Sequence, residues 1–164
     1  MSNWDRTLAL LGSDVIQCDA SVAWDDSVTK GQRLMFRECR VGIADLKNQK
    51  YLSIDLDRYF IGEVFDSIGL HDDGSRKCNM VQMAELMAIN LAAEQCPGFE
   101  IESDCQLAVM SAKLLMPNLR ITWKPRCYLP LPHLIAKETP SGTGTFKFNE
   151  QTPSRGWIQF THEI

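Results

Sequence analysis

The sequence predicts an α/β domain built around a mixed sheet, and two observations carry this prediction. Strand-like runs over residues 34–46 and 50–57 flank a polar KNQK turn, which indicates an antiparallel hairpin. From about residue 80 onward, helical and strand-like segments alternate along the chain. Antiparallel strands followed by alternating helices and strands are typical of an α/β domain with a mixed sheet.

The first half is expected to begin with a buried strand over residues 14–20, because DVIQCDA is short and rich in apolar residues. The polar stretch WDDSVTKGQR separates this strand from the two strands of the hairpin. The acidic, glycine-punctuated segment that follows the hairpin predicts a short helix near 58–68 and then a loop.

The second half is expected to open with a helix that runs from about Met80 and ends before Pro97. GFEIESD predicts a strand that ends at Asp104, and CQLAVMSAKLL predicts a helix that ends before the next proline. NLRITWKPR predicts another strand, and PHLIAKE predicts a short helix with Pro132 in its first turn. Residues 139–164 suggest one or two further strands.

The composition is that of an ordinary globular protein: 164 residues, 45% hydrophobic and 23% charged, enough for one domain with a substantial core. No apolar run reaches membrane-spanning length, and MSNWDRTLALLGSD lacks the pattern of a signal peptide, so the cytoplasm is the expected location. The six cysteines are then expected to be reduced, and without a C-x-x-C pair they predict no structural zinc site. The net charge of −4 means that binding to nucleic acid would need divalent cations or a local basic patch.

Three carboxylates are candidate site residues, although each has an ordinary structural explanation. Glu85 lies in the apolar helix MVQMAELMAINLAAE, where an unpaired carboxylate would be costly unless it points to water. Asp19 lies at the expected end of the first strand, where a turn residue is common. Asp104 follows another expected strand and could cap the helix after it. Ends of strands in open α/β sheets are also where ligand sites gather.

The segments around these carboxylates, taken together, resemble the ribonuclease H family over most of residues 14–138. VIQCDASVAW resembles the family's first strand with its D-x-S motif, and RVGIADLKNQKYLSI resembles the second and third strands. AELMAINLAAE is similar to the family's first helix, and FEIESDCQLAV is similar to its fourth strand and the motif that follows. LRITWKPRCYLPLPHLIAKE is similar to the fifth strand, its W-x-P-R ending and the closing helix.

The resemblance implies a ribonuclease H-like fold, with a five-stranded mixed sheet flanked by helices. Three antiparallel strands would come first, and parallel strands would follow them. We therefore expect a single domain over residues 1–164, with its core in 14–138 and an extra C-terminal segment in 139–164. The insertions after Asp19 and before the first helix, or the C-terminal segment, could bind a protein partner.

The resemblance also implies a set of site residues. Asp19, Glu85 and Asp104 would hold two Mg²⁺ ions, with Mn²⁺ as a substitute, because hard cations prefer oxygen ligands. His133 stands where the family commonly has a fourth acidic residue and is expected to be catalytic, unless it is a helix-start histidine that faces solvent. The expected substrate contacts are Ser21, Gln82 and Gln106.

The activity implied by the resemblance is endonucleolytic hydrolysis of the RNA strand of an RNA–DNA hybrid, recognised through 2′-hydroxyl groups in the minor groove. Another nuclease on the same fold, such as a junction resolvase or an exonuclease, would share the acidic residues. A catalytically inactive interaction module is a third alternative. The acidic net charge favours this alternative, as does the MPN connection, which is too short for the basic handle of some family members.

Overall fold

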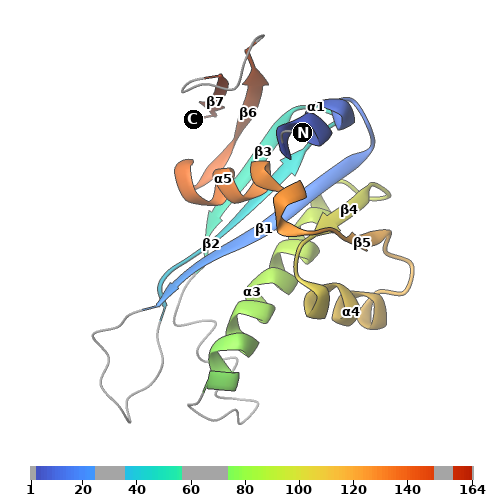
Figure 1. The fold of residues 1–164 in the computed structure, drawn as a ribbon, viewed down its shortest axis with the longest axis vertical. Coiled ribbons are helices and arrows are strands. Elements are labelled where there is room, and N and C mark those ends of the chain that lie inside the picture. Colours follow the sequence, from blue (N-terminus) through green and yellow to red (C-terminus); the bar gives the residue numbers. More distant parts are fainter. Residues whose placement is uncertain (1–2, 25–35, 57–73, 150–156, 164) are drawn as a thin grey trace.

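The computed structural model describes residues 3–24, 36–56, 74–149 and 157–163, which form one mixed sheet with helices on both faces (Figure 1). The strands are β1 (Val15–Trp24), β2 (Phe36–Asp45), β3 (Lys50–Asp55), β4 (Glu100–Ser103), β5 (Ile121–Trp123), β6 (Gly142–Phe148) and β7 (Ile158–His162). The helices are α1 (Asn3–Leu10), α3 (Gly74–Gln95), α4 (Gln106–Leu115), α5 (Pro130–Glu138) and the short 3-10 helix η1 (Arg126–Tyr128).

The strands are arranged in the order β5-β4-β1-β2-β3-β6-β7. β1, β2 and β3 form an antiparallel meander, while β4 and β5 run parallel to β1 beyond its other edge. β6 pairs antiparallel with β3, and β7 pairs antiparallel with β6. The turn between β2 and β3 contains Gln49 with a φ of 54°, and the predicted hairpin is confirmed.

The prediction of an α/β domain with a mixed sheet is confirmed, but the expected number of five strands is wrong. Residues 139–164, expected as an extra segment, supply two further strands of the same sheet. β6 pairs with β3 over Lys50–Ser53, because the outer edge of β3 presents backbone groups that need a partner. The order of the whole sheet therefore does not match the five-strand order 3-2-1-4-5 of the ribonuclease H fold.

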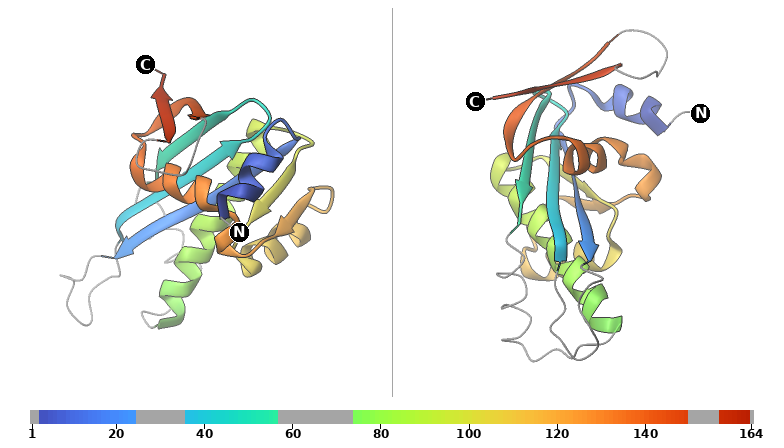
Figure 2. Two further views of the ribbon diagram at one scale, coloured as in Figure 1. Left: turned by 45° about the horizontal axis from the view of Figure 1, so that its top comes forward. Right: turned by 90° about the vertical axis from the view of Figure 1, so that its left-hand side faces the viewer.

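The core lies in two layers, because successive side chains of a strand point to opposite faces of the sheet. α3 and α4 cover one face, where the buried side chains include Ile16, Cys18, Val41, Ile43, Ile89 and Ile101. α1 and α5 lie on the other face, as both views of Figure 2 show. The buried side chains of that second layer are Ala44, Leu46, Tyr51, Leu131, Ile135 and Phe146.

The helices agree with the sequence-based expectations to different extents. α4 and α5 lie where they were expected, and both are confirmed. α3 is also present, but it begins at Gly74, earlier than the expected start near Met80. α1 was not expected, and the short helix expected near 58–68 falls outside the described residues. None of the described helices is long and apolar enough to cross a membrane.

β1 is longer than the predicted strand over residues 14–20. Its antiparallel pairing with β2 extends from Ile16, opposite Asp45, to Trp24, opposite Phe36, with an irregularity before the last pair. This pairing keeps the chain extended well beyond Asp19. The prediction that Asp19 ends its strand is therefore wrong, since it lies in the middle of β1.

α1 is tied to the middle of the sheet by a buried acidic side chain. The Arg6 guanidinium donates hydrogen bonds of 2.9 and 2.5 Å to the two carboxylate oxygens of Glu102 in β4, and Gln17 Nε2 donates to Glu102 at 3.0 Å. Burial alone would raise the pKa of Glu102, but these hydrogen bonds outweigh burial and hold the pKa below its usual value. Glu102 is thus ionised and fixed, two residues before Asp104.

Candidate metal centre

Three acidic side chains from distant parts of the sequence converge at one point of the molecule. Asp19 comes from β1, Glu85 from α3, and Asp104 from the residue directly after β4. One carboxylate oxygen of each lies within 4.8 Å of the corresponding oxygens of the other two. Asp19 is 3% exposed and Glu85 is 5% exposed, so the alternative in which Glu85 points to water is wrong.

The convergence follows from the unequal lengths of β1 and β4. The parallel pairing between them ends at Gln17 and Glu102, and β4 itself ends at Ser103, whereas β1 continues to Trp24. Beyond this point, one edge of β1 has no strand beside it among the described residues. The Glu85 carboxylate lies along this edge and accepts a hydrogen bond from the backbone of Ala20. Glu85 of α3 thereby reaches the backbone of β1 at a position beyond the end of β4.

The three carboxylates impose an electrostatic penalty on one another. Burial raises the pKa of Glu85 to about 10, with further contributions from the negative charges of Asp19 and Asp104. Burial and the charge of Asp19 also raise the pKa of Asp104 to about 6, although the nearby Arg126 guanidinium opposes this shift. The site therefore favours a bound cation, because a cation would allow all three groups to ionise together.

One oxygen of the centre lacks a partner. Glu85 Oε2 is fully buried and has no hydrogen-bond partner, which is a costly state for a carboxylate oxygen. A divalent cation held among the three carboxylates would supply the missing interaction. All the candidate ligand atoms are carboxylate oxygens, which suit hard ions such as Mg²⁺ and Mn²⁺. The donor set and the unpaired oxygen together fit a metal ion.

His133 reaches Asp19 from the opposite face of the sheet. Its Nδ1 atom lies 2.9 Å from Asp19 Oδ2, so the ring contacts a member of the acidic group rather than extending into solvent. The other ring nitrogen, Nε2, lies 3.2 Å from Nη2 of Arg126. Since the guanidinium is a donor, Nε2 is the natural acceptor and Nδ1–H the donor to Asp19.

The contact between His133 and Asp19 depends on how closely α5 approaches β2. Gly42 lies directly opposite Asp19 in the β1–β2 pairing. A Cβ atom on Gly42 would lie 2.6 Å from the backbone nitrogen of Ala136 and closer still to the carbonyl oxygen of Pro132. The absence of a side chain at Gly42 therefore lets α5 pack against the sheet and brings His133 to the carboxylate.

A cavity of about 250 Å³ opens beside the acidic group. One part of its lining is acidic and another is basic, with small apolar side chains between them. The lining residues are Asp19, Ala20, Ser21, Val22, Val81, Glu85, Asp104, Arg126, His133 and Lys137. The structure thus brings together the four predicted catalytic residues and one predicted substrate contact, Ser21.

The two predicted glutamine contacts lie elsewhere. Gln82 is half-buried on α3 and does not line the cavity, and Gln106 is exposed at the first position of α4. Conversely, Arg126 and Lys137 line the cavity but were not predicted as site residues. Their sequence signal was the W-x-P-R run and the lysine four residues after His133, which places that lysine on the same face of a helix.

Comparisons with protein-family models, with curated proteins and with solved structures found no match to this chain.

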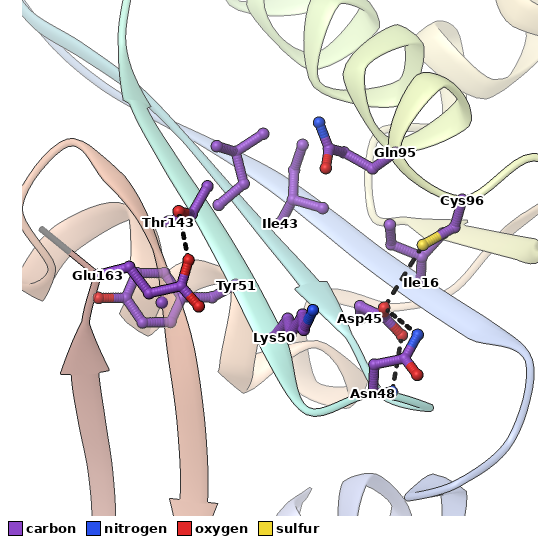
Figure 3. Close-up of a pocket in the computed structure, with 12 residues that line it drawn as sticks. Ile16, Ile43, Asp45, Asn48, Lys50, Tyr51, Gln95, Cys96, Thr143 and Glu163 are labelled. Atoms are coloured by element: carbon purple, nitrogen blue, oxygen red, sulfur yellow. Dashed lines mark hydrogen bonds between the residues drawn. The ribbon is translucent and has the colours of Figure 1, made fainter.

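A second cavity, of about 340 Å³, lies between β3, β6 and the end of α3 (Figure 3). Its buried acidic group, Asp45, accepts hydrogen bonds from the backbone of Lys47 and Asn48, from the Asn48 side chain and from Cys96 Sγ. Glu163 accepts a hydrogen bond from Thr143 at the other end. Because both Asp45 oxygens have protein partners, this cavity lacks the unpaired buried oxygen that distinguishes the metal centre.

Proposed function

We propose that this protein is a metal-dependent nuclease that hydrolyses phosphodiester bonds, with the RNA strand of an RNA–DNA hybrid as its substrate. The observation that carries the proposal is the convergence of Asp19, Glu85 and Asp104 around the buried, unpaired oxygen of Glu85. Three mutually repelling carboxylates are unfavourable in a protein that only needs to fold. They are expected in a protein that binds divalent cations for catalysis.

The proposed reaction is a simple hydrolysis. The oxygen of a water molecule forms a bond to phosphorus, the bond from phosphorus to the 3′ oxygen breaks, and the leaving oxygen takes up a proton. Two divalent cations, when bound, would supply an activated water molecule and would stabilise the charge on the leaving oxygen. Asp19, Glu85 and Asp104 would hold these cations.

The protein's own residues would position the carboxylates and the substrate. His133 donates to Asp19 Oδ2 and thereby fixes the orientation of this carboxylate. Arg126 stands beside His133 and provides positive charge next to the acidic group. Ser21 offers a hydroxyl to the cavity, two residues after Asp19 on the same face of β1.

The choice of substrate within the nucleases rests on the resemblance of the D-x-S segment at Asp19, the AELMA segment at Glu85 and the segment at Asp104 to ribonucleases H. The pairing of the first five strands supports a ribonuclease H-like core. β1–β3 form an antiparallel meander, with β4 and then β5 parallel to β1 on its other side. β6 and β7 depart from this pattern at the far edge of the sheet.

A side-by-side cleavage assay tests the proposal. Labelled RNA–DNA hybrid, double-stranded RNA, double-stranded DNA, single strands and four-way junctions are incubated with the protein in Mg²⁺ and, separately, in EDTA. We expect cleavage of the RNA strand of the hybrid, in Mg²⁺ only. Cleavage of junctions or of single strands instead would assign another nuclease activity to the same site, and no cleavage of any substrate would contradict the proposal.

Matched variants show whether cleavage comes from this site. Asp104→Asn keeps the shape of the side chain but removes its charge, so we expect cleavage to fall by at least about a hundredfold. Glu94→Gln provides the control, since Glu94 is an exposed residue of the same helix as Glu85. Wild-type cleavage by Asp104→Asn, or equal losses in both variants, would show that the three carboxylates are not the catalytic centre.

A further inference from the structure

Two cations line the same cavity as the carboxylates, and neither forms an ion pair with any residue that the structure describes. Arg126 projects from η1, which follows β5, and Lys137 projects from α5 one turn after His133. We propose that Arg126 and Lys137 bind a phosphate group of the substrate directly, independently of the divalent cations. The identity of the substrate as a polynucleotide rests on the proposed function.

Four other cations of the described residues have a carboxylate partner. Arg6 pairs with Glu102, Arg40 with Asp55, Lys47 with Asp14 and Arg120 with Glu100. Within the described ranges, neither Arg126 nor Lys137 has a carboxylate within ion-pair distance. Arg126 Nη2 instead lies 3.2 Å from the imidazole of His133. A guanidinium and an ammonium that line a cavity and form no ion pair with a described residue can donate hydrogen bonds to an anionic ligand.

The arrangement of charge in the cavity favours a phosphate that lies between the carboxylates and the two basic side chains. Asp19, Glu85 and Asp104 would bind it only through bound cations, whereas Arg126 and Lys137 would donate hydrogen bonds to its oxygens directly. The protein as a whole carries a net charge of −4, which repels polyanions. Arg126 and Lys137 would offset part of this repulsion at the cavity that the substrate has to reach.

The size of the cavity indicates which part of the substrate enters it. Its volume of about 250 Å³ lies below the range of roughly 300–1,000 Å³ that is common for pockets enclosing a drug-sized ligand. A phosphate group with its cations fits such a space. A phosphate of a polynucleotide backbone is therefore the group that we expect in the cavity, with the rest of the chain outside it.

Binding and metal affinity together test the proposal. The probe is a fluorescent RNA–DNA hybrid of about 20 base pairs, a length chosen to span the footprint of a small domain. Its affinity is measured by anisotropy in EDTA and again in Ca²⁺, over a series of salt concentrations, with the hybrid checked on a gel afterwards. Mn²⁺ affinity is measured separately by calorimetry. The variants are Arg126→Gln, Arg126→Lys and Lys137→Gln, and Lys113→Gln is the control because Lys113 lies exposed on α4, away from the cavity.

We expect Arg126→Gln and Lys137→Gln each to weaken hybrid binding about tenfold. Each substitution should also reduce the slope of log K against log salt concentration by about 1. Arg126→Lys should retain part of the affinity because it keeps the charge, and Lys113→Gln should bind like the wild type. Mn²⁺ binding to Arg126→Gln should be as tight as in the wild type or tighter, because the substitution removes a positive charge from beside Asp104.

Two results would overturn the proposal. Unchanged hybrid binding by both glutamine variants would show that these cations do not contact the substrate. Parallel losses of hybrid and Mn²⁺ binding in Arg126→Gln would show that Arg126 only supports the structure of the site through His133. The proposed function can fail separately: if no substrate is cleaved but hybrid binding depends on Arg126 and Lys137, the phosphate site stands and the nuclease activity does not.

Discussion

Glu85 is the residue at which the requirements of folding and of the proposed chemistry conflict. Its carboxylate is buried, lies beside two other carboxylates and leaves one oxygen without a hydrogen bond. Folding without a cation must therefore either keep this group protonated or bury an uncompensated charge. The metal-free protein is less stable than the same fold with a neutral side chain at this position.

Glu85→Gln should consequently stabilise the metal-free protein at neutral pH, because the raised pKa of Glu85 means that ionisation of its carboxyl group opposes folding. The same substitution should abolish the stabilisation that Mg²⁺ gives the wild type, because a ligand has been lost. Thermal unfolding in EDTA and in Mg²⁺ measures both effects. Glu94→Gln should behave like the wild type in both buffers, and a Glu85→Gln protein that still gains stability from Mg²⁺ would contradict the assignment.

The pH dependence of stability has a definite sign at this site. In the folded protein the pKa of Glu85 is raised from 4.5 to about 10 and that of Asp104 from 3.8 to about 6. Above pH 4 the unfolded chain therefore loses these protons while the folded protein retains them. The contribution of these two carboxyl groups to stability is therefore largest at acidic pH and decreases as the pH rises. The decrease ends near pH 6 for Asp104 and continues to higher pH for Glu85.

The measurement is the unfolding free energy in EDTA from pH 4 to pH 8, for the wild type and for Asp104→Asn. The wild type should lose stability relative to Asp104→Asn between pH 4 and pH 6, and the difference should then stay constant. Saturating Mg²⁺ should reverse the difference, since the cation favours the ionised carboxylates. A constant difference across the whole range in EDTA would mean that Asp104 titrates normally.

At the scale of elements, the site depends on the close contact between α5 and β2. Gly42→Ala should push α5 away, because the new methyl group would overlap the backbone at Pro132 and Ala136. We expect a loss of roughly 1–3 kcal/mol in stability together with a lower kcat, because His133 is displaced from Asp19. Thermal unfolding and steady-state kinetics on the hybrid are the two measurements.

Gly144→Ala is the matched control for Gly42→Ala. Its added methyl group would meet the Thr161 backbone of β7 and the Tyr51 ring of β3, and it would not meet the backbone of α5. It should lower stability and leave the kcat of the folded protein unchanged. A similar fall in kcat for both variants would mean that stability alone, and not the position of α5, controls the site.

The sequence predicted those elements whose patterns are local. The hairpin, α4 and α5 could be recognised because a polar turn, a helical repeat of apolar residues and a proline in the first turn each lie within a few neighbouring residues. The apolar run alone placed the end of the first strand near residue 20, whereas the segment matched by the family resemblance, VIQCDASVAW, has the bounds of β1, which stays extended through its pairing with β2. The pairing of β1 with β2 therefore places Asp19 in the middle of its strand rather than at the predicted end.

The same distinction holds for the candidate site. Asp19, Glu85, Asp104 and His133 were predicted because they fall within segments that resemble a family pattern, and the structure brings all four together. Arg126 and Lys137 were not predicted, because a basic residue in isolation is most often an ordinary surface residue. Only the fold shows that both line the same cavity.

For the whole molecule, residues 139–164 belong to the sheet rather than forming a separate appendage. β6 covers the edge of β3, and Phe146 of β6 is buried in the same layer as Tyr51, which also stacks edge-on against Phe160 of β7. Arg40 of β2 adds a further link, since it donates to the Thr139 carbonyl and to Ser53. The C-terminal segment thus completes one face of the core.

Deletion of residues 142–164 should therefore destabilise the protein severely and promote aggregation, because it exposes the edge of β3 and the side chain of Tyr51. Size-exclusion chromatography and thermal unfolding of the truncated chain provide the measurement. A monomer with the stability and the cleavage rate of the full chain would show that β6 and β7 are dispensable. In that case, their place in the sheet would not contribute to the fold.

The edge of β1 beyond β4 also gives the molecule an internal reporter. The backbone of Ala20 donates to the Glu85 carboxylate rather than to a neighbouring strand, so the protection of its amide depends on the state of that carboxylate. A cation keeps Glu85 ionised and a strong acceptor, whereas a protonated Glu85 is a weaker one. Hydrogen–deuterium exchange at Ala20 should accordingly be slower in Mg²⁺ than in EDTA, while exchange at Ile43, in the middle of the β1–β2 pairing, stays the same. A single amide can thus follow the occupancy of the site without substrate and without turnover.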